Sequence, residues 1–238
     1  MKYILVLIFL VFSTFRVPAA SAAPLVEYHL QLPKAEDGGK NIALTFDACM
    51  GKVDRRILDA LVQSKIKATI FVTARWLKYN PKAIAILKAN HDLFEIENHG
   101  AQHVLAVDEV RDVFGLKSAG TPDAVAAEVE DGAAAIQANF GEWPKWYRGA
   151  AAIYTDSSMT LIKELDFKLG GFSLSGDGGA AWSSAHAAKT VASAKDGDVI
   201  ITHINQPTRP AGAGVVEGIL KLKADGFNFV TLSEGFKN

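Results

Sequence analysis

The chain has 238 residues, a formal net charge of −1 and a hydrophobic content of 49%. Balanced charge gives no indication of a nucleic-acid or membrane-surface partner, because such partners select for a strongly basic surface. The chain has one cysteine and therefore no internal disulfide, so its stability must come from an apolar core, which this composition permits.

The first 22 residues have the features of a secretory signal peptide. Lys2 gives a positive start, an apolar run continues to Phe15, and Ala20-Ser21-Ala22 matches an A-x-A cleavage pattern. The run of about 13 residues is too short for a bilayer core, which needs roughly 20, so a retained membrane anchor is the less favoured alternative. We therefore expect export to the periplasm or the medium, with a mature chain that begins near Ala23 or Pro24.

The mature chain is expected to contain an irregular lead-in over residues 23–39 and one domain over residues 40–238. Within this domain, buried strands are predicted at 41–47, 68–72, 93–97, 146–148, 168–174, 198–203 and 227–232. Helices are predicted at 54–64, from Pro81 onward, and at 121–140, 157–165, 184–193 and 214–224. Residues 104–120 are less periodic and are expected to form a loop with a short helix.

Strands and helices alternate about seven times, a pattern typical of α/β folds with parallel strands and right-handed crossovers. A barrel of βα units is favoured over an open doubly wound sheet. No dinucleotide or phosphate-loop glycine motif follows the first strand, which makes a nucleotide enzyme less favoured. In the helix at 121–140, a group of acidic residues is expected to form a solvated face: Asp123, Glu128, Glu130 and Asp131.

The segment LFEIENHGAQH, residues 93–103, is predicted to be a buried strand that runs out into two histidines, His99 and His103. Residues four apart lie on one face of a helical turn, so both imidazoles can converge on one divalent cation such as zinc. Two unrelated histidines are the alternative. The metalloprotease motif HExxH is excluded, because Gly100 stands where it needs glutamate.

Other polar residues also stand where predicted strands end, which is where barrel active sites are built. Asp47 is either a loop cap or a catalytic base, His203 is a candidate general acid, and Arg148 is a candidate partner for a carboxylate. Asp177 lies in a glycine loop, where a backbone turn alone also explains it. Taken together, these residues predict a metal-assisted hydrolase.

The ordered motifs resemble those of the polysaccharide deacetylases, carbohydrate esterase family 4 with its NodB-homology domain. The resemblance covers about residues 40–235. It rests on segments that occur in the family's order, namely Thr45-Phe46-Asp47, Asn98-His99-Gly100-Ala101-Gln102-His103, Tyr147-Arg148, the loop around Asp177, Val199-Ile200-Ile201-Thr202-His203 and the final LKADGFNFVTLSE.

The resemblance implies a distorted (β/α)7-type barrel with an incomplete ring, and a catalytic domain over residues 40–238. It implies that His99 and His103 bind a divalent metal, zinc being expected, and that Asp47 is the base and His203 the acid. Arg148 would orient Asp47 and lower its pKa, and Asp177 would raise the pKa of His203. The metal and a backbone N–H would hold the oxyanion.

The chain departs from the family at Ala48, where the family has the aspartate that is its third protein ligand to the metal. Three explanations remain open: Asp47 ligates the metal itself, another residue such as Cys49 or Asp177 does so, or the metal is weakly bound or absent. Cys49 is more typical of a small packed residue. The third and fourth motifs also depart from the family, with Gly149-Ala150-Ala151-Ala152 in place of prolines and Ala181 before Trp182.

Three functions follow for comparison. The first is a metal-dependent deacetylase of N- or O-acetylated carbohydrate, whose partner is a polymer or an oligosaccharide. No nucleic-acid partner is expected, and no membrane association is expected after signal cleavage. The second is a hydrolase of a different C–N amide bond on the same scaffold. The third is a catalytically silent carbohydrate-binding homologue, although the retained Asp47, Arg148 and His203 argue against it.

Overall fold

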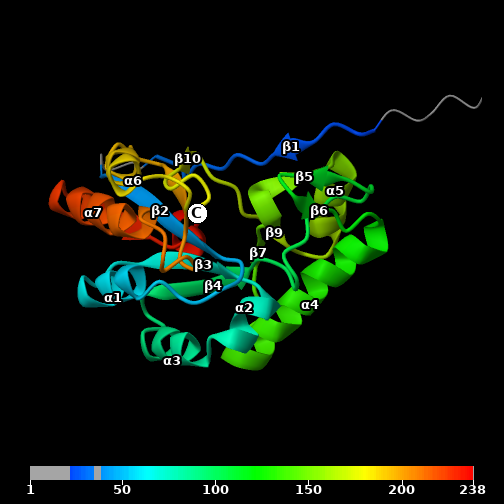
Figure 1. Ribbon diagram of the computed structural model, residues 1–238, viewed down its shortest axis with the longest axis horizontal. Helices are drawn as coiled ribbons and strands as arrows, with labels where there is room; N and C mark the ends of the chain where they lie inside the picture. The colour runs from blue at the N-terminus through cyan, green and yellow to red at the C-terminus, as the bar shows by residue number, and fades with distance from the viewer. Residues whose placement is uncertain (1–21, 35–38, 238) are drawn as a thin grey trace, which may run out of the picture.

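The computed structural model describes residues 22–34 and 39–237 (Figure 1). Residues 1–21, which make up nearly all of the predicted signal peptide, lie outside the described residues. Among the described residues, no helix combines the length and the apolar character that crossing a membrane requires.

The predicted alternation of strands and helices is present along the described chain. The strands are β1 (Val26–Glu27), β2 (Asn41–Ala48), β3 (Ala68–Val72), β4 (Phe94–Asn98), β5 (Asp112–Val113), β6 (Leu116–Lys117), β7 (Trp146–Tyr147), β8 (Ile153–Tyr154), β9 (Lys168–Leu169), β10 (Leu174–Ser175), β11 (Val199–His203) and β12 (Asn228–Val230). The helices are α1 (Arg55–Gln63), α2 (Ala74–Tyr79), α3 (Pro81–Ala89), α4 (Pro122–Phe140), α5 (Asp156–Glu164), α6 (Ser184–Val191), α7 (Ala211–Ala224) and α8 (Leu232–Gly235).

The main sheet has the strand order β10-β11-β2-β3-β4-β7-β9, with β12 also paired to β2, and every pairing in it is parallel. Its end strands β9 and β10 do not pair with each other in the described chain, so the curled sheet does not close into a complete ring. Helices lie around its outer side (Figure 1). The prediction of a distorted (β/α)7-type barrel with parallel strands is therefore confirmed.

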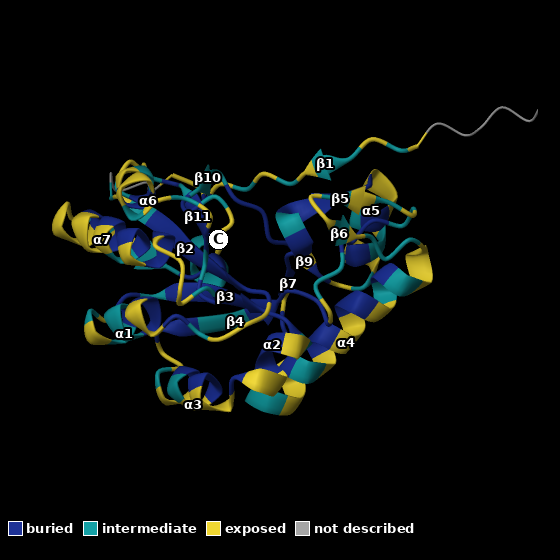
Figure 2. Ribbon diagram, in the orientation of Figure 1, coloured by how far each residue is buried: buried dark blue, intermediate teal, exposed yellow. Residues whose placement is uncertain are grey.

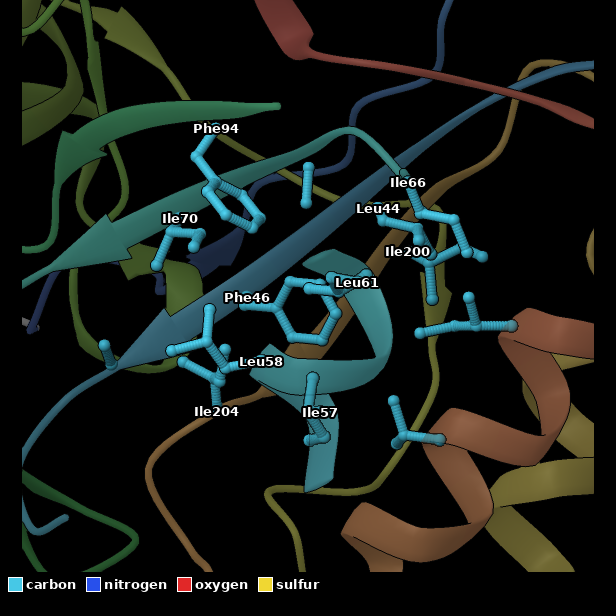
Figure 3. Packing of buried hydrophobic residues seen from close by; sticks show 14 of the residues in the cluster. Leu44, Phe46, Ile57, Leu58, Leu61, Ile66, Ile70, Phe94, Ile200 and Ile204 are labelled. Carbon is cyan, nitrogen blue, oxygen red and sulfur yellow. The ribbon is translucent and has the colours of Figure 1, made fainter. Parts of the chain in front are cut away.

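Strand β2 is the centre of the sheet and is buried on both faces. Its alternate residues point to opposite sides, as in any strand. Phe46 and the other even-numbered residues from Ile42 to Ala48 belong to the apolar cluster that includes α1, where Phe46 packs beside Leu58 and Leu61 (Figure 3). The odd-numbered residues Thr45 and Asp47 therefore point to the interior of the curled sheet, and this places the carboxylate on the same side as the other strand-end residues.

The lead-in is more regular than expected. Its strand β1 pairs antiparallel with β8. Further along, the N–H of Leu30 donates to the carbonyl of Phe172 and the N–H of Leu32 donates to that of Gly197. The lead-in thus runs across the segment between β9 and β10, beside the open part of the sheet, as the blue trace in Figure 1 shows.

Two predicted elements were wrong. Residues 104–120 contain no helix and instead form the β5–β6 hairpin, whose two-residue turn has positive φ at Phe114 (55°) and Gly115 (75°). Such primed turns match the twist of hairpin strands. The strand predicted at 168–174 is split into β9 and β10, because the chain passes Tyr28 at Gly171, where a Cβ would lie 2.4 Å from the Tyr28 carbonyl oxygen.

Helices α2 and α8 were not predicted. Each begins after a threonine that caps it: Thr73 accepts from the N–H of Trp76, and Thr231 accepts from that of Glu234. The prediction left Thr73 unassigned and placed Thr231 in a strand. Both helices are short, so neither shows a full helical period. Burial follows the layers, with the sheet dark and the outer helix faces exposed (Figure 2).

Candidate active site

The predicted site residues lie together at the carboxyl ends of the parallel strands. Asp47 and His203 are neighbours across the β2–β11 pairing, while His99 directly follows β4 and Arg148 directly follows β7. Asp47 and His203 line a cavity of about 240 Å³. Its lining consists of Asp47, His103, Phe114, Leu116, Ala151, Phe172, Ser175, Gly179, Ile201 and His203. The lining is mostly apolar and carries a few polar side chains, as is typical of small-molecule sites.

Arg148 fixes Asp47 in one orientation. Its Nη1 donates to Asp47 Oδ1 at 2.9 Å and to Thr45 Oγ1 at 2.9 Å, and its other nitrogens donate to the carbonyls of Gly170 and Gly171. Burial on its own raises the pKa of Asp47, but His99 first, then Arg148 and His203, outweigh burial, and the pKa is lowered. Asp47 is thus an ionised carboxylate whose second oxygen is not bound by the guanidinium.

Asp177 holds His203. One carboxylate oxygen accepts from the backbone N–H of His203 at 2.7 Å, and the other lies 3.0 Å from its Nδ1. Burial lowers the pKa of His203, but the hydrogen bond to Asp177 and the contact with Cys49 raise it well above its usual value. Because Nδ1 faces a carboxylate, Nε2 is the nitrogen that can deliver a proton to another group.

His99 and His103 converge, but through a turn rather than the helical turn that their spacing predicted. Gly100 has φ 86° and His103 has φ 66°, and the two imidazole centroids are 4.9 Å apart. The turn is held by Glu128 of α4, whose carboxylate accepts from the backbone N–H groups of Gln102 and His103 at 3.0 and 2.8 Å.

Glu128 corrects the prediction of an all-solvated acidic face on this helix, since it is 5% exposed. The close approach of α4 to the turn depends on Gly132, where a Cβ would lie 2.3 Å from Asn98 Oδ1. No sequence signal marked either residue as part of the site, because both act from a helix that the chain forms some 25 to 30 residues later.

Cys49 is the other residue that the structure brings to the histidines. Its Sγ lies 3.4 Å from His99 Nε2. Burial raises the pKa of its thiol, but His99 and hydrogen bonds with His103 and His203 outweigh burial and lower the pKa well below its usual value. In turn, burial lowers the pKa of His99, but Asp47 and Cys49 raise it to about 9.

These donors fit a divalent cation. One donor atom from each of Cys49, His99 and His103 lies within 4.8 Å of the other two. His103 Nδ1 is shielded from solvent and has no hydrogen-bond partner. This nitrogen thus lacks the partner that a buried polar atom normally has. Imidazole and thiolate suit zinc and its first-row neighbours better than magnesium or calcium.

The arrangement therefore combines an ionised carboxylate, a protonated imidazole and a cluster of side chains that can bind a metal, at one end of the parallel sheet. Two titratable groups whose pKa values are displaced in opposite directions are what paired acid and base catalysis requires. The geometry is that of a hydrolytic site.

Comparison with known proteins agrees with this chemistry. A family model described as polysaccharide deacetylase matches residues 34–170, more than half of the chain. The chain belongs to the polysaccharide deacetylase family. The prediction of a polysaccharide deacetylase-like hydrolase is confirmed at the level of this family.

Among curated proteins, the bifunctional xylanase/deacetylase of Pseudobutyrivibrio xylanivorans is 27% identical over 202 residues, which is 83% of this chain and 31% of that protein. The chain thus spans about a third of this curated relative's length. Among solved structures, a family 4 acetyl xylan esterase from Clostridium thermocellum, in complex with a cobalt ion, is 27% identical with a TM-score of 0.66, over 83% of this chain and 90% of that one.

Two further structures share the fold. The peptidoglycan deacetylase PdaC from Bacillus subtilis is 24% identical with a TM-score of 0.66, over 84% of this chain and 92% of that one. A carbohydrate esterase family 4 pseudoenzyme from Bacillus anthracis is 18% identical with a TM-score of 0.66, over 86% of this chain and 68% of that one. The fold is therefore shared by members with and without activity, so function must be argued from the residues of the site.

Proposed function

We propose that this protein is an exported, metal-dependent hydrolase that removes acetyl groups from N- or O-acetylated carbohydrate polymers. The observation that carries the proposal is the presence of two dyads, Asp47 with Arg148 and His203 with Asp177. Asp47 and His203 lie on adjacent strands and line one cavity. Relatives named for xylan and peptidoglycan support a polymer of the cell wall or of plant material as the substrate class.

Asp47 is proposed as the base. Its Oδ1 is occupied by Arg148, so Oδ2 takes the proton of the water that attacks the acetyl carbonyl carbon. The lowered pKa keeps the carboxylate ionised at neutral pH, and the guanidinium keeps it aimed.

His203 is proposed as the acid. When the tetrahedral intermediate collapses, the C–N or C–O bond breaks and the leaving amine or alkoxide takes a proton from Nε2 of His203, because Nδ1 faces Asp177. Acetate and the free amine or hydroxyl are the products. The raised pKa keeps the imidazole protonated before this step.

His99 and His103 are proposed to hold the divalent metal, with zinc the expected ion. When bound, the cation acts as a Lewis acid that promotes ionisation of the attacking water and stabilises negative charge on the carbonyl oxygen. The prediction of His99 and His103 as ligands is consistent with their converging imidazoles.

A silent carbohydrate-binding homologue is the second candidate, and one observation favours it: Ala48 replaces the carboxylate that the family uses to bind metal. Both dyads are nonetheless complete. A binding protein has no need of a buried base fixed by arginine beside an acid tuned by aspartate.

Release of acetate from acetylated xylan, chitin oligosaccharides and peptidoglycan tests the proposal. Asp47→Asn is expected to lower kcat on the order of 10²- to 10⁴-fold, the usual contribution of general acid–base catalysis, while binding of the polymer persists. Asp59→Asn, a change at a half-buried acid on the outer side of α1 that pairs with Arg55, is the matched control and should leave kcat unchanged. If the wild-type protein binds these polymers but releases no acetate from any of them, the silent homologue is the better assignment.

A further inference from the structure

Strand β2 carries consecutive residues to opposite sides at the point where the metal-binding residues gather. Ala48 is fully buried among the outward-facing apolar residues that pack against the helices. Cys49 follows it on the same side as Asp47, because residues two apart in an extended chain share a face. The side chain of position 48 is therefore turned away from the histidines, and that of position 49 is turned toward them.

The histidine nitrogens are arranged to accept a cation beside this sulfur. His99 Nδ1 lies 2.6 Å from the carbonyl oxygen of Arg148, which can only accept, so this nitrogen carries a proton and Nε2 is the nitrogen left to bind a cation when its own proton leaves. Nε2 is the atom that lies 3.4 Å from Cys49 Sγ. A backbone carbonyl that fixes the tautomer in this way is typical of metal-ligating histidines.

The other candidates for a third ligand are committed elsewhere. Both oxygens of Asp177 are engaged by His203. Asp47 Oδ1 accepts from Arg148, and its Oδ2 lies 3.6 Å from His99 Nε2, but Asp47 does not join the set of donor atoms that lie within 4.8 Å of one another. Among the described residues, that set consists of Cys49, His99 and His103.

We propose that Cys49 is the third protein ligand, so that Cys49, His99 and His103 form a Cys-His-His site that takes the place of the family's carboxylate-based set. The inference rests on the proposed function only for the location of the metal. Binding forms one bond from the metal to the Cys49 sulfur and one to His99 Nε2, and the proton that these two atoms share in the metal-free protein is released to solvent. Three protein ligands leave one open position, as catalytic zinc sites do.

A thiolate changes which metals the site prefers. Soft sulfur together with two imidazoles favours zinc and cobalt over manganese, magnesium and calcium, which prefer oxygen. A cysteine in this position therefore explains how the site can keep a divalent ion without the family's aspartate.

Cobalt is the probe, because a thiolate bound to Co²⁺ gives a sulfur-to-metal charge-transfer band in the near-ultraviolet, whereas histidine and carboxylate ligands do not. The chain has one cysteine, so any such band must come from Cys49. The purified protein, stripped of metal and titrated with Co²⁺, is expected to bind one ion per chain. The intensity of the band should stop rising when one equivalent of Co²⁺ has been added.

Three variants test the assignment. Cys49→Ser should abolish the band and weaken metal binding by more than the roughly 10- to 100-fold that loss of an outer hydrogen-bond partner costs. Cys49→Asp should bind one Co²⁺ without the band. Asp47→Asn should keep both the band and the stoichiometry, because Asp47 is outside the ligand set.

Alkylation gives a second measurement that leaves Cys49 itself unmutated. Iodoacetamide should modify Cys49 in the metal-free protein, and zinc should slow this reaction. Zinc should give no protection in His99→Ala.

The outcomes separate this inference from the proposed function. One Co²⁺ bound without the band, together with unchanged affinity in Cys49→Ser, would overturn the role of Cys49 and leave the hydrolase standing. Failure of the wild-type protein to bind zinc or cobalt would also overturn the role of Cys49 as a metal ligand. A band that Cys49→Ser abolishes, in a protein that releases no acetate, would support the ligand and refute the hydrolase.

Discussion

Arg148 is fully buried, and its guanidinium does more than neutralise Asp47. Its nitrogens bind the Asp47 carboxylate, the Thr45 hydroxyl and the carbonyls of Gly170 and Gly171, and its Cζ lies 4.2 Å from the centre of the Phe71 ring. A lysine keeps the charge but cannot reproduce a planar fork of donors.

We therefore expect Arg148→Lys to lower kcat on the order of 10²-fold, because a small displacement of a catalytic group has effects of this size. It should also lower the Tm, since carbonyls that the fork satisfied would be left buried and unpaired. Steady-state acetate release and thermal unfolding measure the two effects. Arg55→Lys, an exposed change on α1, should alter neither, and an Arg148→Lys protein with unchanged kcat would contradict the orienting role.

The residues that could be predicted from the sequence are those that stand at strand ends. Asp47 and His203 each end an apolar run that predicts a buried strand. Their place at the ends of these strands was enough to predict that both lie at one edge of the sheet. Glu128 was mistaken for a surface residue, because nothing local shows that a helix glycine, Gly132, lets α4 approach the histidine turn. Cys49 was one of the candidate ligands but was judged more typical of packing, because its neighbours His99 and His103 follow a strand that is distant in sequence.

The β5–β6 hairpin contributes Phe114 and Leu116 to the lining of the cavity. Phe114 stands at its turn with 84% of its surface exposed, yet it lines the cavity, as Phe172 also does. An aromatic ring in this position can pack against the apolar face of a sugar ring.

Phe114→Ala is expected to raise KM for a polymeric substrate by roughly 2- to 12-fold, the equivalent of an aromatic contact worth about 0.5–1.5 kcal/mol, with little change in kcat. Val110→Ala is the matched control, because Val110 is just as exposed but does not line the cavity. Equal KM values for the wild-type protein and Phe114→Ala would show that substrate does not reach the hairpin.

Helices and strands were predicted correctly where the periodic segment was long, and the predictions failed where it was short. Helix α4 has a threonine cap, a first-turn proline and many turns, and its bounds agree with the structure. The hairpin has strands of two residues each, and its turn has phenylalanine and glycine rather than the usual Asn-Gly, so neither alternation nor turn chemistry marked it. Strands β9 and β10 were joined in the prediction because the sequence does not show that Tyr28 passes between them at Gly171.

At the scale of the whole molecule, the alternation of elements predicts a parallel barrel but not its gap. Whether a ring of parallel strands closes depends on contacts between its first and last members, here β10 and β9, which no local pattern encodes. The β4–β7 junction is also weak, since it pairs through Asn98 and Tyr147 alone. Next to it, β4 carries a buried acid, Glu97, which lines a second cavity of about 480 Å³.

Glu97 makes the stability of the whole fold depend on pH. Burial first, and then the neighbouring Glu95, raise the pKa of Glu97 from 4.5 to about 9, although it accepts the backbone N–H groups of Lys145 and Trp146. A carboxyl whose pKa is higher in the folded chain binds its proton more tightly there. Its favourable contribution is therefore complete below the unfolded pKa of about 4.5, and it declines as the pH rises toward 9.

Glu97→Gln keeps an oxygen that can accept those N–H groups and removes the ionisation. In the metal-free protein we expect its Tm to exceed that of the wild type at pH 8 by a few degrees, where about 2–4 °C corresponds to 1 kcal/mol in a chain of this size. The advantage should shrink as the pH falls toward 4.5, and Glu130→Gln, an exposed change on α4, should show no such trend. Thermal unfolding across this range measures it, and a constant difference between Glu97→Gln and the wild type would mean that Glu97 is ionised in the folded protein.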